Sequence, residues 1–318
     1  MTSLRAAVVP VLLLVACRSG GERPDALDPA AARDGDEIVV CGKLFDVGTT
    51  VVPWFEAPYY SAYAPHPRFA DEGPSGLRYR PGREVADPGL QRRVDGRGFR
   101  LDELREVVDL FVIHYDVCGT SRRCFEVLQD VRKLSVHFLL DVDGTIYQTL
   151  DLSEQAWHAA QANPRSIGIE LAQIGAYPVG GENPFDAWYA VDEAGPRLTI
   201  PESLGADGVR TPDFVGRPAR PGLHLGSIQG VEYAQHDFTP EQYDALVALT
   251  AALCEIFPRI APDAPRDAAG RVRTDALDDG DLAAFQGILG HQHVTERKQD
   301  PGPAFDWEGY LSAVRARL

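Results

Sequence analysis

Long apolar runs, basic clusters and internal repeats are all missing from this sequence of 318 residues. No stretch of 18 apolar residues occurs, which excludes a membrane-spanning helix. Lys and Arg number 31 against 47 Asp and Glu, so the formal charge is −16. Because nucleic-acid affinity comes largely from Lys and Arg on phosphates, this balance excludes a nucleic-acid-binding protein. The H-x-x-x-H pattern of helical zinc proteases is also absent.

The remaining composition is that of a globular protein. Hydrophobic residues make up 44% and charged residues 25%, and the length allows one large domain or two ordinary ones. Gly and Pro are abundant, with 30 and 24 residues. Their number predicts long irregular loops between the regular elements.

The first residues resemble a bacterial lipoprotein signal. Arg5 precedes an apolar run over residues 6–15, too short to span a bilayer, and the run ends in Leu-Val-Ala-Cys at Cys17. The resemblance implies a signal peptide over 1–16 that is removed and a lipid attached to Cys17. The alternative is an ordinary signal cleaved near Ala16, with Cys17 incidental. Residues 17–36 are polar and predict a flexible tether.

The lipoprotein resemblance also implies a location. The protein would be anchored by lipid in the bacterial cell envelope. Because Arg18 follows the lipidated cysteine in place of Asp, the resemblance favours the periplasmic face of the outer membrane if the host has two membranes.

The other four cysteines form an even set, which permits disulfides in an exported protein. Cys118 and Cys124 are close enough in sequence to close a small loop. Cys41 and Cys254 could pair only if the fold brings them together. Cys254 also lies on a helical pattern, where a buried free thiol is equally compatible with the sequence.

From residue 101 onward, strand and helix patterns alternate. Residues 37–100, rich in Pro, Gly and aromatics, predict an N-terminal extension packed on the main domain, and residues 174–236 predict a long insertion. Strands are expected at 111–113, 136–140, 145–150 and 166–172, and helices at 121–134, 240–257 and from 307 to the C-terminus. Thr239, Pro240 and Gln242 supply the start signals of the second helix. Interleaved strands and helices predict an α/β domain with a mixed central sheet flanked by helices.

Possible metal ligands lie at the ends of two expected strands. His114 closes the first strand, and His291 and His293 follow a late apolar segment, with Asp300 in a Pro-Gly loop beyond them. A hydrolytic zinc site needs about three protein ligands and one open position. Each of these residues taken alone is unspecific, since a histidine after a strand is commonly packed and Asp before Pro-Gly is commonly a turn residue.

Four motifs in one order make the combination specific. They are FVIHYD (111–116), SVHFLLDVDGTIYQTL (135–150), AWHAAQANPRSIGIEL (156–171) and GHQHVTERKQDPGPAFDW (290–307). With them the chain resembles the zinc-dependent N-acetylmuramoyl-L-alanine amidases of type 2, which are related to phage lysozyme-type amidases and to peptidoglycan-recognition proteins. The resemblance covers 108–173 and 237–315. It implies a single domain of the peptidoglycan-recognition and amidase type over 101–318, enlarged by the insertion at 174–236.

The resemblance implies a set of zinc ligands. The family's first-strand histidine corresponds to His114, its late Gly-His histidine to His291, and its acidic or cysteine ligand before Pro to Asp300. His293 is a rival to His291, but relatives commonly have an acidic residue there.

It also implies the catalytic groups. Glu170 corresponds to the family's strand glutamate, the acceptor and donor of the reacting proton. Lys298 corresponds to the lysine that stabilises the oxyanion. Alternation along the strand puts Glu170 on the face opposite Ile169 and Leu171. Some relatives use a tyrosine before the second-strand histidine, but this chain has Val136 there, so the glutamate mechanism is favoured.

His158 matches a loop that borders the substrate in the family. Four further residues are candidate substrate contacts: Trp157, Asn163, Arg165 and His137. These four have alternative readings, with Trp157 in the core, Asn163 and Arg165 in loop hydrogen bonds, and His137 packed away from the cleft. The pair Cys118 and Cys124 resembles a disulfide of the recognition proteins.

These observations predict a zinc hydrolase that cuts the amide between the lactyl group of N-acetylmuramic acid and L-alanine. Its cofactor would be Zn²⁺ and its partners peptidoglycan and a membrane reached through the lipid, and we expect a monomer. The alternatives are a non-catalytic peptidoglycan-binding envelope lipoprotein and a zinc peptidase acting on another amide. Because the chain is acidic, substrate binding would depend on a local cleft rather than on bulk charge.

Overall fold

The computed structural model describes residues 33–318. The predicted signal at 1–16, Cys17 and most of the tether lie outside the described residues. Within residues 33–318, no helix combines the length and the apolar character that crossing a membrane requires.

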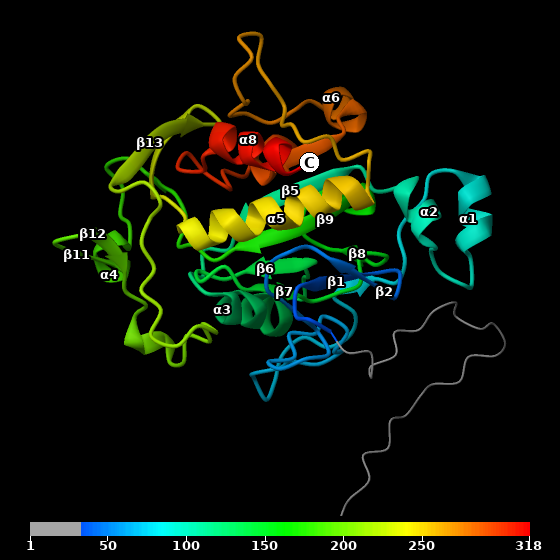
Figure 1. Ribbon diagram of the computed structural model, residues 1–318, viewed down its shortest axis with the longest axis horizontal. Helices are drawn as coiled ribbons and strands as arrows, with labels where there is room; N and C mark the ends of the chain where they lie inside the picture. Colours follow the sequence, from blue (N-terminus) through cyan, green and yellow to red (C-terminus); the bar gives the residue numbers. More distant parts are fainter. Residues whose placement is uncertain (1–32) are drawn as a thin grey trace, which may run out of the picture.

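A six-stranded mixed sheet forms the centre of the molecule, as expected from the sequence (Figure 1). Its strands, in spatial order, are β15 (Gly287–Gly290), β5 (Leu110–Tyr115), β9 (Ser166–Leu171), β6 (Phe138–Leu140), β7 (Ile146–Gln148) and β3 (Val51–Pro53). All neighbours are parallel except the hairpin β6–β7. The strands of the first half, β15, β5 and β9, therefore end at the same edge.

Two long helices cover one face of this sheet. α5 (Pro240–Ile256) and α8 (Trp307–Arg317) lie side by side across it (Figure 1). Thr239 caps the start of α5: its side chain accepts a hydrogen bond from the Gln242 amide, and both halves of the predicted capping box form. The apolar face of α5 and alternate residues of β5 and β9 share one buried cluster, which is the main core of the fold.

Short helical elements cover the opposite face. These are α3 (Ser121–Glu126), α6 (Asp279–Ala284), α7 (His291–Val294) and the 3₁₀ segment Ala160–Arg165. The helix expected over 121–134 is shorter as an α-helix, because a π-helical segment continues it from Val127 to Arg132. It ends at Lys133, which adopts the left-handed conformation with φ 55°.

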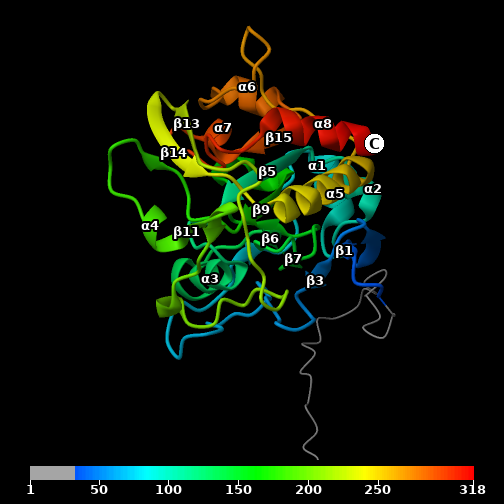
Figure 2. The ribbon, with the colours of Figure 1, turned by 60° about the vertical axis from the view of Figure 1, so that its left-hand side comes forward.

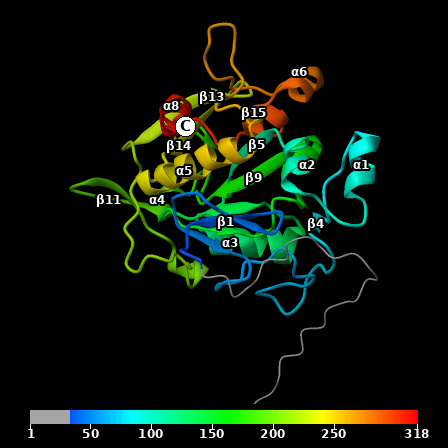
Figure 3. The same cartoon turned by 45° about the vertical axis from the view of Figure 1, so that its right-hand side comes forward.

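The N-terminal extension is part of the same core. The hairpin β1 (Glu37–Val40) and β2 (Lys43–Asp46) packs on it, and β3 joins the central sheet beside β7. β4 (Tyr79–Arg80) pairs with β8 (Gln155–Ala156). The helices α1 (Pro88–Val94) and α2 (Leu101–Arg105) lie together at one side of the molecule (Figure 3).

The insertion contains regular structure where long irregular loops were expected. It holds β10 (Tyr177–Pro178), α4 (Phe185–Trp188), the hairpin of β11 (Tyr189–Asp192) and β12 (Gly195–Leu198), a 3₁₀ turn (Glu202–Leu204), β13 (Leu223–Ile228) and β14 (Val231–His236). β10, β14 and β13 form a separate antiparallel sheet. Figure 2 shows β13 and β14 beside α7 and β15.

The predicted disulfide between Cys118 and Cys124 is not formed, and both residues are free thiols. Their side chains do meet, as the short sequence separation suggested, but as a hydrogen-bonded pair. Burial and this hydrogen bond raise the pKa of Cys124 well above its usual value. Cys41 and Cys254 are free as well, and Cys254 is buried in the core face of α5.

Candidate metal centre

Three parallel strands bring the candidate residues to one edge of the sheet. His114 on β5 is the register partner of Glu170 on β9, and Gly290 on β15 is the partner of Ile113. His291 follows Gly290 directly as the first residue of α7. Because the carboxyl ends of parallel strands meet, residues far apart in sequence become neighbours here.

His114, His291 and Asp300 form a compact group of potential metal ligands. The Nδ1 atoms of His114 and His291 are 2.9 Å apart. Asp300 Oδ2 lies 3.0 Å from the first nitrogen and 3.1 Å from the second. All three side chains are buried, and no other such group of three occurs among residues 33–318.

The donor set fits zinc. Two imidazole nitrogens and a carboxylate oxygen are ligands of catalytic zinc, and bonds of about 2.0–2.2 Å in tetrahedral geometry place donors roughly 3.3 Å apart. Burial and the neighbouring His291 lower the pKa of His114 to about 4. Burial alone would raise the pKa of Asp300, but His291 and His114 hold it well below its usual range. His114 and Asp300 are therefore unprotonated at neutral pH, as metal binding requires.

Glycine at position 290 lets the Asp300 loop lie against the strand end. A Cβ at Gly290 would stand 2.6 Å from Pro301 Cδ and 3.2 Å from the Asp300 carbonyl oxygen. That carbonyl accepts a hydrogen bond of 3.0 Å from the Gln292 amide. The Gly-His motif thus places two ligand candidates: His291 belongs to the motif, and Gly290 leaves room for the loop that carries Asp300.

The rival histidine is engaged elsewhere. His293 is fully buried, and its Nδ1 accepts a hydrogen bond of 2.9 Å from the Gly290 amide. Its Nε2 lies 2.7 Å from the Arg273 carbonyl oxygen, to which it donates. The structure therefore groups His291, and not His293, with the other two ligand candidates.

Glu170 lies beside this group with one free oxygen. Ile169 and Leu171, its neighbours along β9, point into the main core, so Glu170 is on the opposite face as expected. Its Oε2 atom is buried without a hydrogen-bond partner. Burial, followed by the negative charge of Asp300, raises its pKa well above the usual value. The positive charge of Lys298 acts in the opposite direction and lowers the pKa of Glu170.

His158 lies against the ligand candidate His114. Its Nδ1 is 2.9 Å from His114 Nε2, and its own Nε2 is 3.2 Å from Ser166 Oγ. A Cβ at Gly168 would stand 2.5 Å from the His158 ring, so the glycine in β9 makes room for the imidazole. If His114 donates Nε2–H to His158, the lone pair of His114 Nδ1 is free for a metal. The sequence analysis placed His158 among the substrate contacts. The one sequence feature that agrees with its place against His114 is the glycine at position 168, which leaves room for the ring.

Three of the other predicted substrate contacts, His137, Asn163 and Arg165, form hydrogen bonds with groups of the protein. His137 is fully buried, accepts a hydrogen bond from the Gly168 amide and donates to the Glu154 carbonyl, so it is packed away from the cleft. Asn163 Oδ1 accepts from two amides of the 156–165 loop. Arg165 pairs with Asp109 at 2.6 Å and donates to backbone carbonyls at the C-terminal end of α6. Trp157 is half-buried.

Sequence reasoning missed Arg83, a fully buried arginine from the N-terminal extension. Its guanidinium donates to the carbonyl oxygens of Leu152, Pro164 and Ser166. These bonds tie the extension to both ends of the loop that carries His158. No sequence signal distinguishes Arg83 from the other arginines of this Pro- and Gly-rich segment, because its partners are backbone carbonyls, which every residue has.

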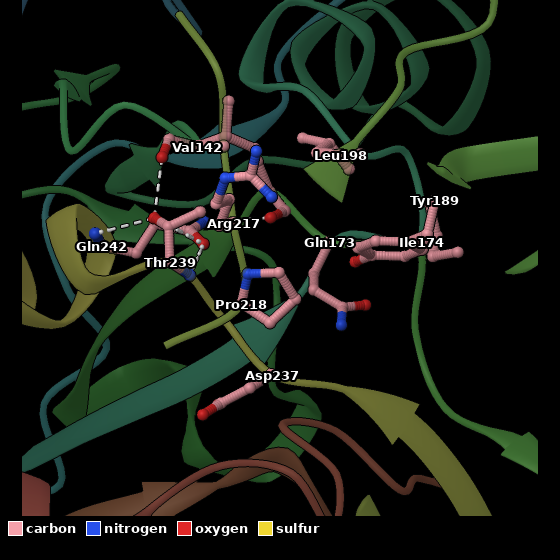
Figure 4. Close-up of a pocket in the computed structure, with 13 residues that line it drawn as sticks. Val142, Gln173, Ile174, Tyr189, Leu198, Arg217, Pro218, Asp237, Thr239 and Gln242 are labelled. Atoms are coloured by element: carbon pink, nitrogen blue, oxygen red, sulfur yellow. Dashed lines mark hydrogen bonds between the residues drawn. The ribbon is translucent and has the colours of Figure 1, made fainter. Parts of the chain in front are cut away.

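A separate pocket lies between the insertion and the start of α5 (Figure 4). It contains none of the three metal-ligand candidates. Thr239 Oγ1 donates to the Val142 carbonyl and accepts from the Gln242 amide. Asp237 is paired with Arg220 and with the Tyr243 hydroxyl. The polar groups around this pocket thus serve the fold, and the metal-ligand group is the candidate site.

A family model described as N-acetylmuramoyl-L-alanine amidase matches residues 104–194 and 215–303, more than half of the chain. The matched ranges contain all three ligand candidates as well as Glu170 and Lys298. The unmatched stretch between them lies inside the insertion.

Individual relatives are distant. The 1,6-anhydro-N-acetylmuramyl-L-alanine amidase AmpD of Haemophilus influenzae is 23% identical over 185 residues, 58% of this chain and 60% of that protein. The chain thus spans about three fifths of that relative's length. A solved structure of E. coli AmiD with an anhydro-muropeptide substrate is 19% identical and covers 65% of this chain and 57% of its own, with a TM-score of 0.36. AmpDh3 of Pseudomonas aeruginosa with anhydromuramic pentapeptide is 18% identical and covers 72% and 66%, with a TM-score of 0.38.

Proposed function

Because this chain belongs to the N-acetylmuramoyl-L-alanine amidase family, we propose that it hydrolyses the amide between the lactyl group of N-acetylmuramic acid and L-alanine in peptidoglycan fragments. The observation that carries the proposal is the buried group of His114, His291 and Asp300 with the unpaired carboxylate oxygen of Glu170 beside it. The name of the Haemophilus influenzae relative supports the substrate class.

Each residue has a distinct role in the proposed reaction. His114, His291 and Asp300 hold Zn²⁺, which when bound supplies a water of lowered pKa and polarises the amide carbonyl. Glu170 accepts the proton of the attacking water and delivers it to the leaving amine nitrogen of L-alanine. Its raised pKa makes the carboxylate a stronger base. The Lys298 ammonium stabilises the negative charge that develops on the carbonyl oxygen.

Digestion of purified muropeptides tests this function. We expect the lipid-free protein to release free stem peptide, to stop after treatment with a chelator, and to resume when Zn²⁺ is added back. Mass spectrometry of the two products identifies the bond that is cut. Binding of muropeptide without cleavage would make the protein a peptidoglycan-binding module, and cleavage within the stem peptide would make it a peptidase. Either result overturns the proposal.

We also propose that the protein is a lipoprotein of the bacterial cell envelope, at the periplasmic face of the outer membrane in a two-membrane host. The support is the short apolar run that ends at Cys17, followed by Arg18. Cys17→Ala is expected to remove the lipid and move the protein from the membrane fraction to the soluble fraction. Fractionation and labelling with a radioactive fatty acid measure this, with Cys41→Ala as the matched control. A Cys17→Ala protein that stays on membranes would place the anchor elsewhere.

A further inference from the structure

The hairpin β13–β14 of the insertion lies against the segment that carries two of the site residues (Figure 2). We call residues 292–304 the ligand loop, because Lys298 and Asp300 belong to it. Beyond α7 the ligand loop contains no helix or strand of its own. Two backbone hydrogen bonds lie within the loop, from the Gln292 amide to the Asp300 carbonyl and from the Lys298 amide to the Thr295 carbonyl. The loop also has polar contacts with its neighbours, and two glutamines of the hairpin make such contacts.

Gln229, at the tip of the hairpin, binds the first half of the ligand loop. Its Nε2 donates to the Gln292 carbonyl at 2.8 Å and lies 3.5 Å from the Thr295 carbonyl oxygen and 3.4 Å from that of Lys298. Its Oε1 accepts from the Ala276 amide at 3.2 Å. One side-chain amide thus lies against three carbonyls of the loop, of which that of Thr295 also accepts a hydrogen bond from the Lys298 amide.

Gln235, on β14, binds the second half of the ligand loop. Its Nε2 donates to the Pro301 carbonyl at 3.0 Å, and its Oε1 accepts from the Ala304 amide at 3.0 Å. The chain wraps closely around this amide, since a Cβ at Gly302 would stand 2.2 Å from Gln235 Oε1. The side chain is fully buried. It fixes the backbone immediately after Asp300.

We propose that this hairpin is a positioning device for the metal site, in which Gln235 sets Asp300 against His114 and His291 while Gln229 fixes the backbone that carries Lys298. The inference rests on the proposed zinc amidase function. It assigns β13 and β14 a role other than that of a lid, because the hairpin is held to the loop by hydrogen bonds. Sites held by a loop need such support to keep their donors in place.

The two glutamines are expected to fail in different ways. Gln235→Leu should weaken the zinc affinity of the folded protein about 10–100-fold, the usual effect of losing an outer-shell partner. Gln229→Leu should leave zinc affinity close to that of the wild type but lower kcat about tenfold at saturating zinc, through Lys298, with a smaller change in KM. Chelator competition on the metal-free protein, the absorption spectrum of the Co²⁺ form and steady-state kinetics measure these effects.

Gln129 provides a matched control far from the site. Its Nε2 also donates to two backbone carbonyls, those of Ala64 and His66, at 2.9 and 2.8 Å. Gln129→Leu is expected to lower the unfolding temperature and leave zinc affinity and kcat unchanged. If Gln235→Leu does not fold, Gln235→Glu replaces it, because it keeps the acceptor for Ala304 and loses only the donor to Pro301.

The possible results distinguish a failure of the hairpin's positioning role from a failure of the proposed hydrolysis. Wild-type zinc affinity in the Gln235 variant together with wild-type kcat in the Gln229 variant would overturn the positioning role. So would an equal loss of zinc affinity in Gln129→Leu. If the wild type binds zinc but does not cleave muropeptides, the proposed function fails, while weaker zinc binding by the Gln235 variant still supports the link from the hairpin to Asp300.

Discussion

Glu170→Gln is expected to lower kcat by about 10²–10⁴-fold, the usual contribution of a positioned general acid–base, while the protein still binds zinc. Glutamine has nearly the same shape as glutamate but cannot accept the water proton. Glu170 has a buried oxygen without a partner and a pKa raised by burial, so replacing a charge with a neutral amide there should not unfold the protein. Product release from muropeptide and metal content of the same sample measure the two effects.

Glu193→Gln is the control for this variant, because Glu193 is an exposed glutamate of the insertion, away from the metal group. Its activity should match the wild type. Full activity of Glu170→Gln would assign the proton transfer to another group. Loss of zinc together with activity would instead place Glu170 among the residues that hold the metal.

Asp300→Ala is expected to lose zinc and, with it, all measurable turnover. Asp300 supplies the only negative charge among the three ligand candidates, and its Oδ2 contacts both histidine nitrogens. The loss of affinity should exceed the roughly 10–100-fold effect of an outer-shell change. Metal analysis after dialysis and chelator competition give the result directly.

Asp300→Cys is the matched rescue variant, because a thiolate is also a zinc ligand. It should retain zinc, with altered activity. If Asp300→Ala keeps zinc bound as tightly as the wild type, then the metal site lies elsewhere or another carboxylate completes it, and the proposed ligand set is wrong.

Local signals in the sequence predicted the regular elements well where residue types act on the backbone directly. Thr239 and Pro240 marked the first turn of α5, and the capping box with Gln242 formed as expected. Asp306 caps α8. Alternation along β9 put Glu170 on the face opposite the core. These features depend on hydrogen bonds and side-chain directions within a few residues. They can therefore be predicted from the sequence without knowledge of the tertiary contacts.

Features that depend on distant contacts were harder to foresee. The insertion looked like loops, but it forms a sheet in which β10 pairs with β14 from more than 40 residues away and β13 pairs with β14 as a hairpin. The thiols of Cys118 and Cys124 meet without a disulfide. His158 matched a substrate segment, yet its ring lies against His114 and Ser166.

By itself, the sequence determined the α/β class, the order of the main elements and the types of side chain available for a zinc hydrolase, because periodicity, caps and motifs are local properties. The family resemblance favoured His291 over His293, but only the tertiary structure showed that His291 contacts Asp300 while His293 binds the Arg273 carbonyl. The tertiary structure alone also decided that Gln229 and Gln235 hold the ligand loop. Both arrangements depend on parallel strands and a hairpin that bring segments remote in sequence close together in space. The spacing of residues along the chain does not predict such contacts.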